Sequence, residues 1–203
     1  MNLISIKNLS KKYGKKIVFE NLNLELTTEN IYFLTSINGS GKTTFFKCLL
    51  RETKYDGYIY DKSVKYAYLP EKIMWPSFTS LNYYLKVFIT LENDLINDEK
   101  NLQNVIDNYL LYFKIDKYKY QSVNTLSKGT KQKTLIIKTI LSNADVYLFD
   151  EPLTGLDKKS REIFMQIIKT MQEQGKLIII ASHYYDDYKY DNKKVINLNE
   201  ETY

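Results

Sequence analysis

The chain has 203 residues, of which 44% are hydrophobic and 26% charged, as expected for one globular domain or one domain with an inserted subdomain. Its formal net charge of +5 is carried almost entirely by lysine, and the scarcity of arginine (Arg51 and Arg161) disfavours sequence-specific DNA binding, so no nucleic-acid partner is expected. The single cysteine, Cys48, excludes an internal disulfide and indicates a reducing compartment, and no apolar run approaches the roughly 20 residues that cross a bilayer.

The N-terminal third of the chain has mainly the pattern of strands. Side chains alternate between apolar and polar in the first two segments, whereas IYFL at residues 31–34 is continuously apolar, as in a buried strand. One helix is predicted at residues 42–51. The pattern predicts strands, in chain order, at residues 2–9, 19–27, 30–35, 57–61 and 64–70.

From about Ser80 the apolar spacing changes to that of helices. Helices are predicted at residues 80–91, 101–113, 127–144 and 158–174, the third of them opening at Ser127. Buried strands are predicted at residues 145–152 and 176–183. This order indicates an α/β fold with a helical subdomain near residues 72–126, and ligands in such sheets bind at the carboxyl ends of the strands.

The stretch SINGSGKT at residues 36–43 lies between a predicted strand and a predicted helix. At such a junction, backbone N–H groups and the helix dipole form a nest for phosphate oxygens. Lys42 can reach the terminal phosphates, and the hydroxyl of Thr43 can bind Mg²⁺. The stretch matches G-x-x-x-x-G-K-[ST] except at its first position. It therefore predicts nucleotide binding by Ser36, Asn38, Gly39, Ser40, Gly41, Lys42, Thr43 and Thr44.

Ser36 is the departure from this pattern. Glycine at this position lets the strand turn sharply into the loop, and serine can do the same at modest strain if its φ stays negative. The alternative is that Ser36 weakens nucleotide binding.

The stretch VYLFDEP ends a predicted buried strand with two carboxylates. Beside a phosphate site, Asp150 would hold Mg²⁺ through water and Glu151 would orient the attacking water as general base. The alternative is a solvated acidic strand end without a catalytic role.

The stretch TLSKGTKQK at residues 125–133 places a serine and a glycine at the start of a helix, where N–H groups suit an anion. Read alone, Ser127 is an ordinary helix cap. Read with its neighbours, the stretch resembles the LSGGQ signature of ATP-binding-cassette (ABC) ATPases, with Lys128 and Thr130 as departures.

The resemblance to ABC ATPases covers nearly the whole chain, with six motifs in the family's order. These are Tyr13 in LSKKYGKK for the adenine-stacking aromatic, SINGSGKTT for Walker A, YLPE for the Q-loop, LFDEP for Walker B, LTGLD for the D-loop, and His183 in IIIASH for the switch histidine. The resemblance implies a P-loop NTPase core of ABC type, with a small antiparallel β subdomain and an inserted α-helical subdomain. It places the core at residues 1–71 and 127–203 and the helical subdomain at residues 72–126.

The same resemblance implies ATP and Mg²⁺ as ligands and assigns roles to single residues. Lys42, Glu151 and His183 are expected to be catalytic, with His183 bonded to the γ-phosphate. Ser127 and Gly129 are expected to act in trans and to touch the γ-phosphate bound by a second subunit. Asp157 is expected to be the acidic residue of the D-loop.

Glu71 stands where the family has the Q-loop glutamine. It is expected to bind the metal together with Thr43 and Asp150, although a carboxylate adds negative charge near the phosphates. The alternative is a coupling role away from the metal.

The resemblance implies a separate membrane permease as partner and a homodimer or heterodimer of ATPase subunits, held by that permease at the cytoplasmic face of the membrane. The variant motifs resemble those of bacterial exporters of peptides, antibiotics or other small molecules. Some of Met74, Trp75 and Pro76 are expected to contact the permease, whereas Phe78, Leu81 and Leu85 are expected in the core of the helical subdomain. The rival hypothesis is a soluble or regulatory ABC ATPase without a permease.

Overall fold

The computed structural model describes residues 2–35, 41–61, 63–92, 98–183 and 187–198. The chain forms two compact units. The first comprises residues 1–70, 144–151 and 169–203, and the second comprises residues 71–143 and 152–168.

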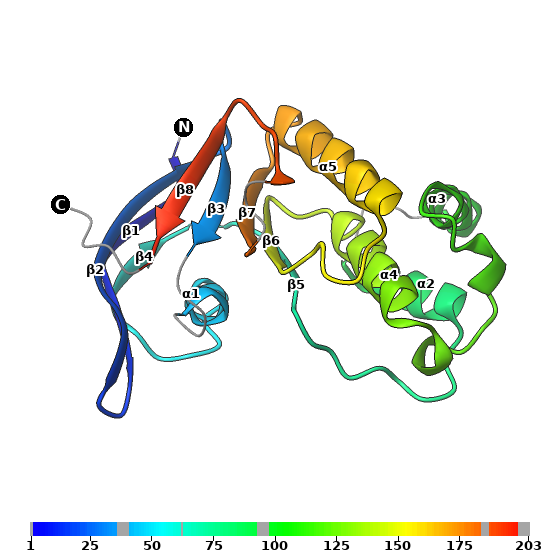
Figure 1. Ribbon diagram of the computed structural model, residues 1–203, viewed down its shortest axis with the longest axis horizontal. Helices are drawn as coiled ribbons and strands as arrows, with labels where there is room; N and C mark the ends of the chain where they lie inside the picture. Colours follow the sequence, from blue (N-terminus) through cyan, green and yellow to red (C-terminus); the bar gives the residue numbers. More distant parts are fainter. Residues whose placement is uncertain (1, 36–40, 62, 93–97, 184–186, 199–203) are drawn as a thin grey trace. The chain divides into compact units, whose positions relative to one another are not determined.

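A parallel sheet forms the centre of the first unit (Figure 1). Its strand order is β5-β6-β7-β3-β8. All side chains of β6 and β7 are buried, which explains why their sequences are almost continuously apolar rather than alternating. The strands are β3 (Ile31–Thr35), β5 (Tyr66–Leu69), β6 (Val146–Asp150), β7 (Leu177–Ala181) and β8 (Lys193–Asn197).

The first unit also contains an antiparallel sheet with the order β2-β1-β4. Its strands are β1 (Asn2–Tyr13), β2 (Lys16–Thr27) and β4 (Asp56–Tyr60). The helix α1 (Lys42–Leu49) joins the two sheets in one hydrophobic core. Phe45 and Phe46 of this helix are fully buried, together with Ile4 of β1 and Leu148 of β6. The core therefore fixes the start of α1 against both sheets.

Gly57 on β4 is a position where only glycine fits. Its φ is +96°, and a Cβ there would lie 2.3 Å from the carbonyl oxygen of Asn8. We expect Gly57→Ala to lower the free energy of unfolding by about 3 kcal/mol or more, since backbone strain and a clash with backbone act together. Urea unfolding followed by circular dichroism measures the change.

Gly175→Ala is the matched control for Gly57→Ala, because Gly175 has a φ of +81° but no atom within 4 Å of an added Cβ. The control measures how much alanine at a positive φ alone lowers the free energy of unfolding. Equal losses in the two variants would contradict the predicted clash at Gly57.

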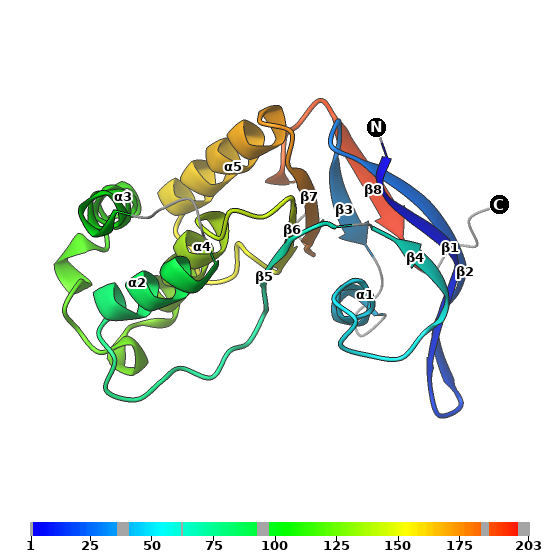
Figure 2. The same ribbon diagram turned by 180° about the vertical axis from the view of Figure 1, so that it is seen from behind.

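The second unit is helical. Its elements are α2 (Leu81–Glu92), α3 (Glu99–Tyr112), the short 3₁₀ helices η1 (Asp116–Tyr118) and η2 (Val123–Thr125), α4 (Lys128–Ile140), and the first part of α5 (Lys158–Glu173). The helix α2 packs against α3 and α4 (Figure 2). The carboxylate of Asp98 caps α3 by accepting hydrogen bonds from the backbone N–H groups of Lys100 and Asn101. In the described residues, no helix is long and apolar enough to cross a membrane.

The predicted fold class is confirmed: a parallel α/β core, a small antiparallel sheet and a helical region are all present. Strand β8 was not predicted, because its two lysines and short length hide the apolar pattern. The first break between the units, after residue 70, falls next to the predicted boundary at 71/72. The predicted boundary at 126/127 lies inside the second unit. The assignment of functional subdomains stays a prediction.

The prediction for Phe78 was wrong. Its side chain is 96% exposed, whereas Leu81 and Leu85 are fully buried as expected. Phe78 has a φ of +59° and precedes α2, so the helical spacing that buries Leu81 does not extend back to it. Met74 is also exposed, and the ring of Trp75 packs against Tyr84 with centroids 5.2 Å apart.

Candidate nucleotide-binding and hydrolysis site

Three neighbouring parallel strands bring the predicted catalytic residues of the first unit together. The strands β6, β7 and β3 are adjacent and parallel, so their carboxyl ends lie at one edge of the sheet. Lys42 and Thr43 open the helix that follows β3, Asp150 ends β6, and His183 follows β7 by two residues. This edge is the position where sheets of this class bind ligands.

The phosphate loop itself is described only at its end. The predicted residues Ser36, Asn38, Gly39 and Ser40 lie outside the described residues. Gly41 caps α1 with a φ of +109°, and a Cβ there would lie 2.3 Å from Cγ1 of Val18 on β2. Gly41 is therefore required by both its conformation and the close approach of β2. Thr44 lies half-buried in the first turn of the helix.

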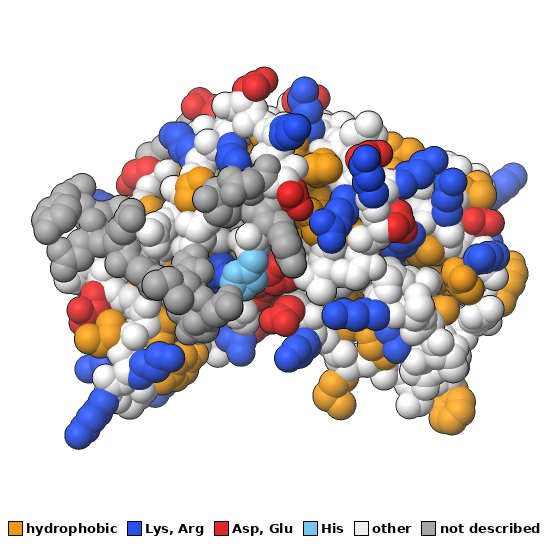
Figure 3. Space-filling view, in the orientation of Figure 1, with side chains coloured by type: hydrophobic (Ala, Val, Ile, Leu, Met, Phe, Trp, Pro, Cys, Tyr) orange, Lys and Arg blue, Asp and Glu red, His pale blue; other side chains and the backbone are white. Residues whose placement is uncertain are grey.

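Lys42, Glu151 and His183 form a compact group of charged and polar side chains. The Nζ atom of Lys42 lies 3.2 Å from Nε2 of His183 and 3.9 Å from Oε1 of Glu151. Lys42 is 9% exposed, whereas the side chain of His183 is 45% exposed. Figure 3 shows the chain's single histidine, in pale blue, at the surface. The histidine thus forms the solvent side of the group and the lysine its buried side.

Thr43 and Asp150 form the second contact of the site. The hydroxyl of Thr43 donates a hydrogen bond of 2.6 Å to Oδ2 of Asp150, which is 2% exposed. The hydroxyl of Tyr68 on β5 donates to the same oxygen at 3.4 Å. Two hard oxygen ligands from α1 and β6 therefore meet at one point, which is the donor chemistry that Mg²⁺ prefers.

Glu151 is held by its backbone in an uncommon conformation. Its φ is +50°, and its N–H donates to the carbonyl oxygen of Ala181 at 2.8 Å. Its Oε1 atom is buried and accepts no hydrogen bond from the described residues, although Nε2 of His183 lies 3.4 Å away. Burial raises the pKa of this carboxyl group, and the nearby His183 and Lys42 partly oppose the rise. An oxygen that accepts no hydrogen bond from the described residues and a raised pKa suit a group that accepts a proton.

Tyr13 lies at the end of β1, just before the two-residue turn into β2. It pairs with Lys16 and is 50% exposed. Val18, which contacts the Gly41 position, lies two residues beyond Lys16, about 7 Å along the strand. Tyr13 therefore lies near the turn of the hairpin, a short distance along it from the contact between Val18 and Gly41.

The predicted signature and D-loop residues meet in the second unit. Ser127 caps α4: its Oγ atom accepts a hydrogen bond from the N–H of Thr130 at 3.2 Å. A Cβ at Gly129 would lie 2.8 Å from the carbonyl oxygen of Gly155. Asp157 accepts a hydrogen bond of 2.8 Å from Nζ of Lys133, and this bond holds the pKa of its carboxyl group below the ordinary range. The start of α4 and the D-loop are thus packed as one piece.

Glu71 is exposed and lies two residues beyond β5. It is the first residue of the second unit, so the structure does not place it relative to Thr43 and Asp150. Its role as a metal ligand stays a prediction. In the described residues, no group of three or more His, Cys, Asp or Glu could hold a metal ion.

Two residues of the site were missed by sequence reasoning. Val18 carries no signal of its own, because its contact with Gly41 depends on how β2 approaches α1. Tyr68 is one of 19 tyrosines, and only the pairing of β5 with β6 brings its hydroxyl to Asp150.

A comparison with protein families accounts for this arrangement. Residues 19–154, more than half of the chain, match the family model for ABC transporters. The chain belongs to the ABC transporter family. It is therefore an ATP-binding subunit of an ABC transporter, and it hydrolyses ATP.

Relatives of this ABC ATPase carry different names. It is 32% identical to the zinc import ATP-binding protein ZnuC of Rickettsia bellii, over 89% of its own length and 76% of the relative. It is 31% identical to the cytochrome c biogenesis ATP-binding export protein CcmA of Reclinomonas americana, over 90% and 88% of the two chains. A solved ATP-binding subunit of an ABC transporter shares its fold with a TM-score of 0.86 at 21% identity, over 97% and 86% of the chains.

Proposed function

We propose that this ABC ATPase powers a separate membrane permease by binding and hydrolysing two ATP molecules between two ATPase subunits. The proposal rests on five side chains that contact one another in two groups at the carboxyl ends of β3, β6 and β7. These are Lys42, Glu151 and His183, and Thr43 with Asp150. These residue types provide a phosphate cation, a metal-binding pair, a base and a hydrogen-bonding imidazole in one place.

ATP binding would use two regions of the first unit. Lys42 would leave Glu151 and His183 to pair with the terminal phosphates, because a phosphate carries more negative charge than one carboxylate. The phosphate loop and the N-terminus of α1 would hold the phosphate oxygens through backbone N–H groups. Tyr13 would stack on the adenine ring.

Mg²⁺ fits the oxygen pair of Thr43 and Asp150. The described residues lack a larger ligand cluster, so ATP phosphates and water would complete the coordination, as is usual for this ion. When bound, Mg²⁺ supplies positive charge that offsets the charge of the phosphates. We retain Glu71 as a further candidate ligand.

Glu151 would act as the base for the attacking water. Its buried Oε1 atom lacks a hydrogen bond in the described residues and can accept one from water. His183, whose Nε2 atom lies 3.4 Å from Oε1 of Glu151, would hydrogen-bond the γ-phosphate. Together with Glu151 it would fix the position of the attacking water beside this pair. Water then attacks the γ-phosphate in line with the departing ADP.

The second subunit would complete each site. Ser127 and Gly129 of the partner subunit's signature would reach the γ-phosphate in trans, with the D-loop residue Asp157 beside them. The hydrogen bond of Ser127 to Thr130 and the close packing of Gly129 on Gly155 support a preformed surface for this contact. ATP would then favour the closed dimer, and hydrolysis would allow it to open. The partner subunit is a second copy or a paralogue.

The permease would hold the subunits at the cytoplasmic face of the membrane. The proposed contact residues are some of exposed Met74, half-buried Trp75 and half-buried Pro76. The motif variants favour export of a peptide, an antibiotic or another small molecule. The names of the relatives include both zinc import and export, so they support the motor function and neither direction of transport.

Glu151 should give hydrolysis a characteristic pH dependence. Only the deprotonated carboxylate accepts a proton, and burial raises the pKa of Glu151 above the ordinary value of about 4.3. We expect kcat to fall as pH decreases, with an acidic midpoint above that ordinary value. A pH profile of phosphate release from the saturated enzyme measures it. A midpoint at or below the value of an ordinary glutamate would contradict the proposed base.

The experiment that tests the permease partnership is purification from the protein's own cells. The tagged chain is extracted from membranes in mild detergent, and the proteins that co-purify are identified by mass spectrometry. We expect a polytopic membrane protein in stoichiometric amount. Recovery from the soluble fraction alone would favour the rival hypothesis of an ABC ATPase without a permease.

A further inference from the structure

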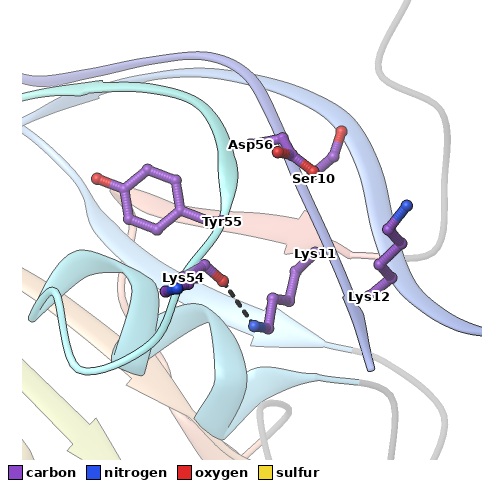
Figure 4. A pocket seen from close by; sticks show the side chains of 6 residues that line it. All are labelled: Ser10, Lys11, Lys12, Lys54, Tyr55 and Asp56. Carbon is purple, nitrogen blue, oxygen red and sulfur yellow. Dashed lines mark hydrogen bonds between the residues drawn. The ribbon is translucent and has the colours of Figure 1, made fainter. Parts of the chain in front are cut away.

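Lys11 is a buried lysine in the first unit, and among the described residues no carboxylate contacts its ammonium group. It is 8% exposed. Its Nζ atom donates to Oγ1 of Thr53 at 2.8 Å and to the carbonyl oxygen of Lys54 at 2.6 Å. Figure 4 shows the second of these bonds. An ammonium group has three N–H donors, so one remains after these two bonds.

The remaining side of the ammonium faces an aromatic ring. Nζ of Lys11 lies 4.4 Å from the centroid of the Tyr13 ring, within the range of a cation–π interaction. Lys11 lies on β1, whereas Thr53 and Lys54 lie in the segment after α1. The two hydrogen bonds between these segments hold the ammonium group beside the ring. Tyr13 is half exposed, so part of its ring surface stays open to a ligand.

The cavity beside Lys11 is too small to be a ligand site by itself. Its volume is about 180 Å³, and its lining residues are Ser10, Lys11, Lys12, Lys54, Tyr55 and Asp56. This volume is below the roughly 300 Å³ at which ligand pockets begin. The position of the Lys11 ammonium is set by its hydrogen bonds to Thr53 and Lys54.

We propose that Lys11 is a positioning residue for nucleotide binding: its fixed ammonium holds one face of the Tyr13 ring and leaves the other face for adenine. The inference rests on the proposed stacking of adenine on Tyr13. Tyr13 lies at the exposed end of a hairpin, so its ring alone would not keep a fixed orientation. The contact with Lys11 fixes that orientation. Lys11 acts on the base of the nucleotide and not on its phosphates.

The test compares two ligands in the presence of Mg²⁺: ATP, which has a base, and inorganic tripolyphosphate, which has none. Calorimetric titration of Lys11→Met is expected to show ATP affinity lowered roughly two- to fivefold, the strength of one exposed cation–π contact, with tripolyphosphate affinity unchanged. Lys11→Arg keeps the charge and donors and should restore ATP affinity. Lys12→Met is the matched control, since Lys12 is exposed and its side chain extends away from Lys54 in Figure 4.

A double variant separates positioning from a structural role. Tyr13→Ala should lower ATP affinity roughly fivefold or more, and adding Lys11→Met should then cause no further loss. Equal loss of ATP and tripolyphosphate affinity in Lys11→Met, or an undiminished second loss in the double variant, would overturn the role of Lys11. If Tyr13→Ala leaves ATP affinity unchanged, adenine stacking on Tyr13 fails and the inference fails with it.

Discussion

Replacing Glu151 with glutamine is expected to reduce steady-state ATP hydrolysis by at least about a hundredfold while leaving ATP binding intact. Glutamine has nearly the same shape but cannot accept a proton from water. In the structure, the carboxylate lies 3.4 Å from Nε2 of His183 and 3.9 Å from Nζ of Lys42, and its Oε1 atom accepts no hydrogen bond from the described residues. Phosphate release at saturating ATP measures the effect.

The same variant should trap two subunits around ATP, because closure no longer leads to hydrolysis. Size-exclusion chromatography with and without ATP should show a dimer only with the nucleotide. Glu162→Gln is the matched control, since Glu162 is an exposed carboxylate on α5. This control variant should hydrolyse ATP at the parent rate. Turnover within about tenfold of the parent, or a monomer in ATP, would contradict the role given to Glu151.

Replacing Gly41 with alanine is expected to lower ATP affinity at least about tenfold, with a smaller effect on folding. Gly41 has a φ of +109°, and an added Cβ would lie 2.3 Å from Cγ1 of Val18. Relief of this clash must move the Val18 side chain, β2 or the start of α1, where Lys42 and Thr43 reach the site. Titration with ATP measures the affinity, and urea unfolding measures the stability.

Val18 provides an internal test of that explanation. Gly41→Ala combined with Val18→Ala removes the clash but keeps the strained φ, so ATP affinity should recover in part. Gly175→Ala, at a positive φ in open space, should leave ATP affinity unchanged. Unchanged affinity in Gly41→Ala, or no recovery in the double variant, would show that the contact between β2 and the phosphate loop is not what positions Lys42.

The sequence predicted where several candidate site residues lie on the fold because these residues follow strands. Asp150 ends a strand that is buried along its whole length, and His183 follows another. Parallel pairing of these strands brings their carboxyl ends to one edge of the sheet. A residue that follows either strand in the sequence is therefore expected at that edge. The same reasoning predicted that Ser127 opens α4, which its hydrogen bond from Thr130 confirms.

The residues that the sequence did not predict depend on packing between distant segments. Tyr68 reaches Asp150 because β5 pairs with β6 in a register that places Tyr68 opposite Leu148. The positive φ of Glu151 is another such feature: no residue type signals it, and it accompanies a hydrogen bond from the Glu151 N–H to Ala181. The prediction that Phe78 is buried was wrong because the residue lies before α2 and has a positive φ, so its side chain points into solvent.

The most direct test of the motor function is ATP hydrolysis by this chain in vesicles, with and without the membrane protein that co-purifies with it. We expect the rate of hydrolysis to change several-fold when the membrane protein is present, and we expect the Glu151→Gln variant to abolish hydrolysis. Hydrolysis at the same rate with and without the membrane protein, although the two remain bound, would contradict the proposed coupling to a permease.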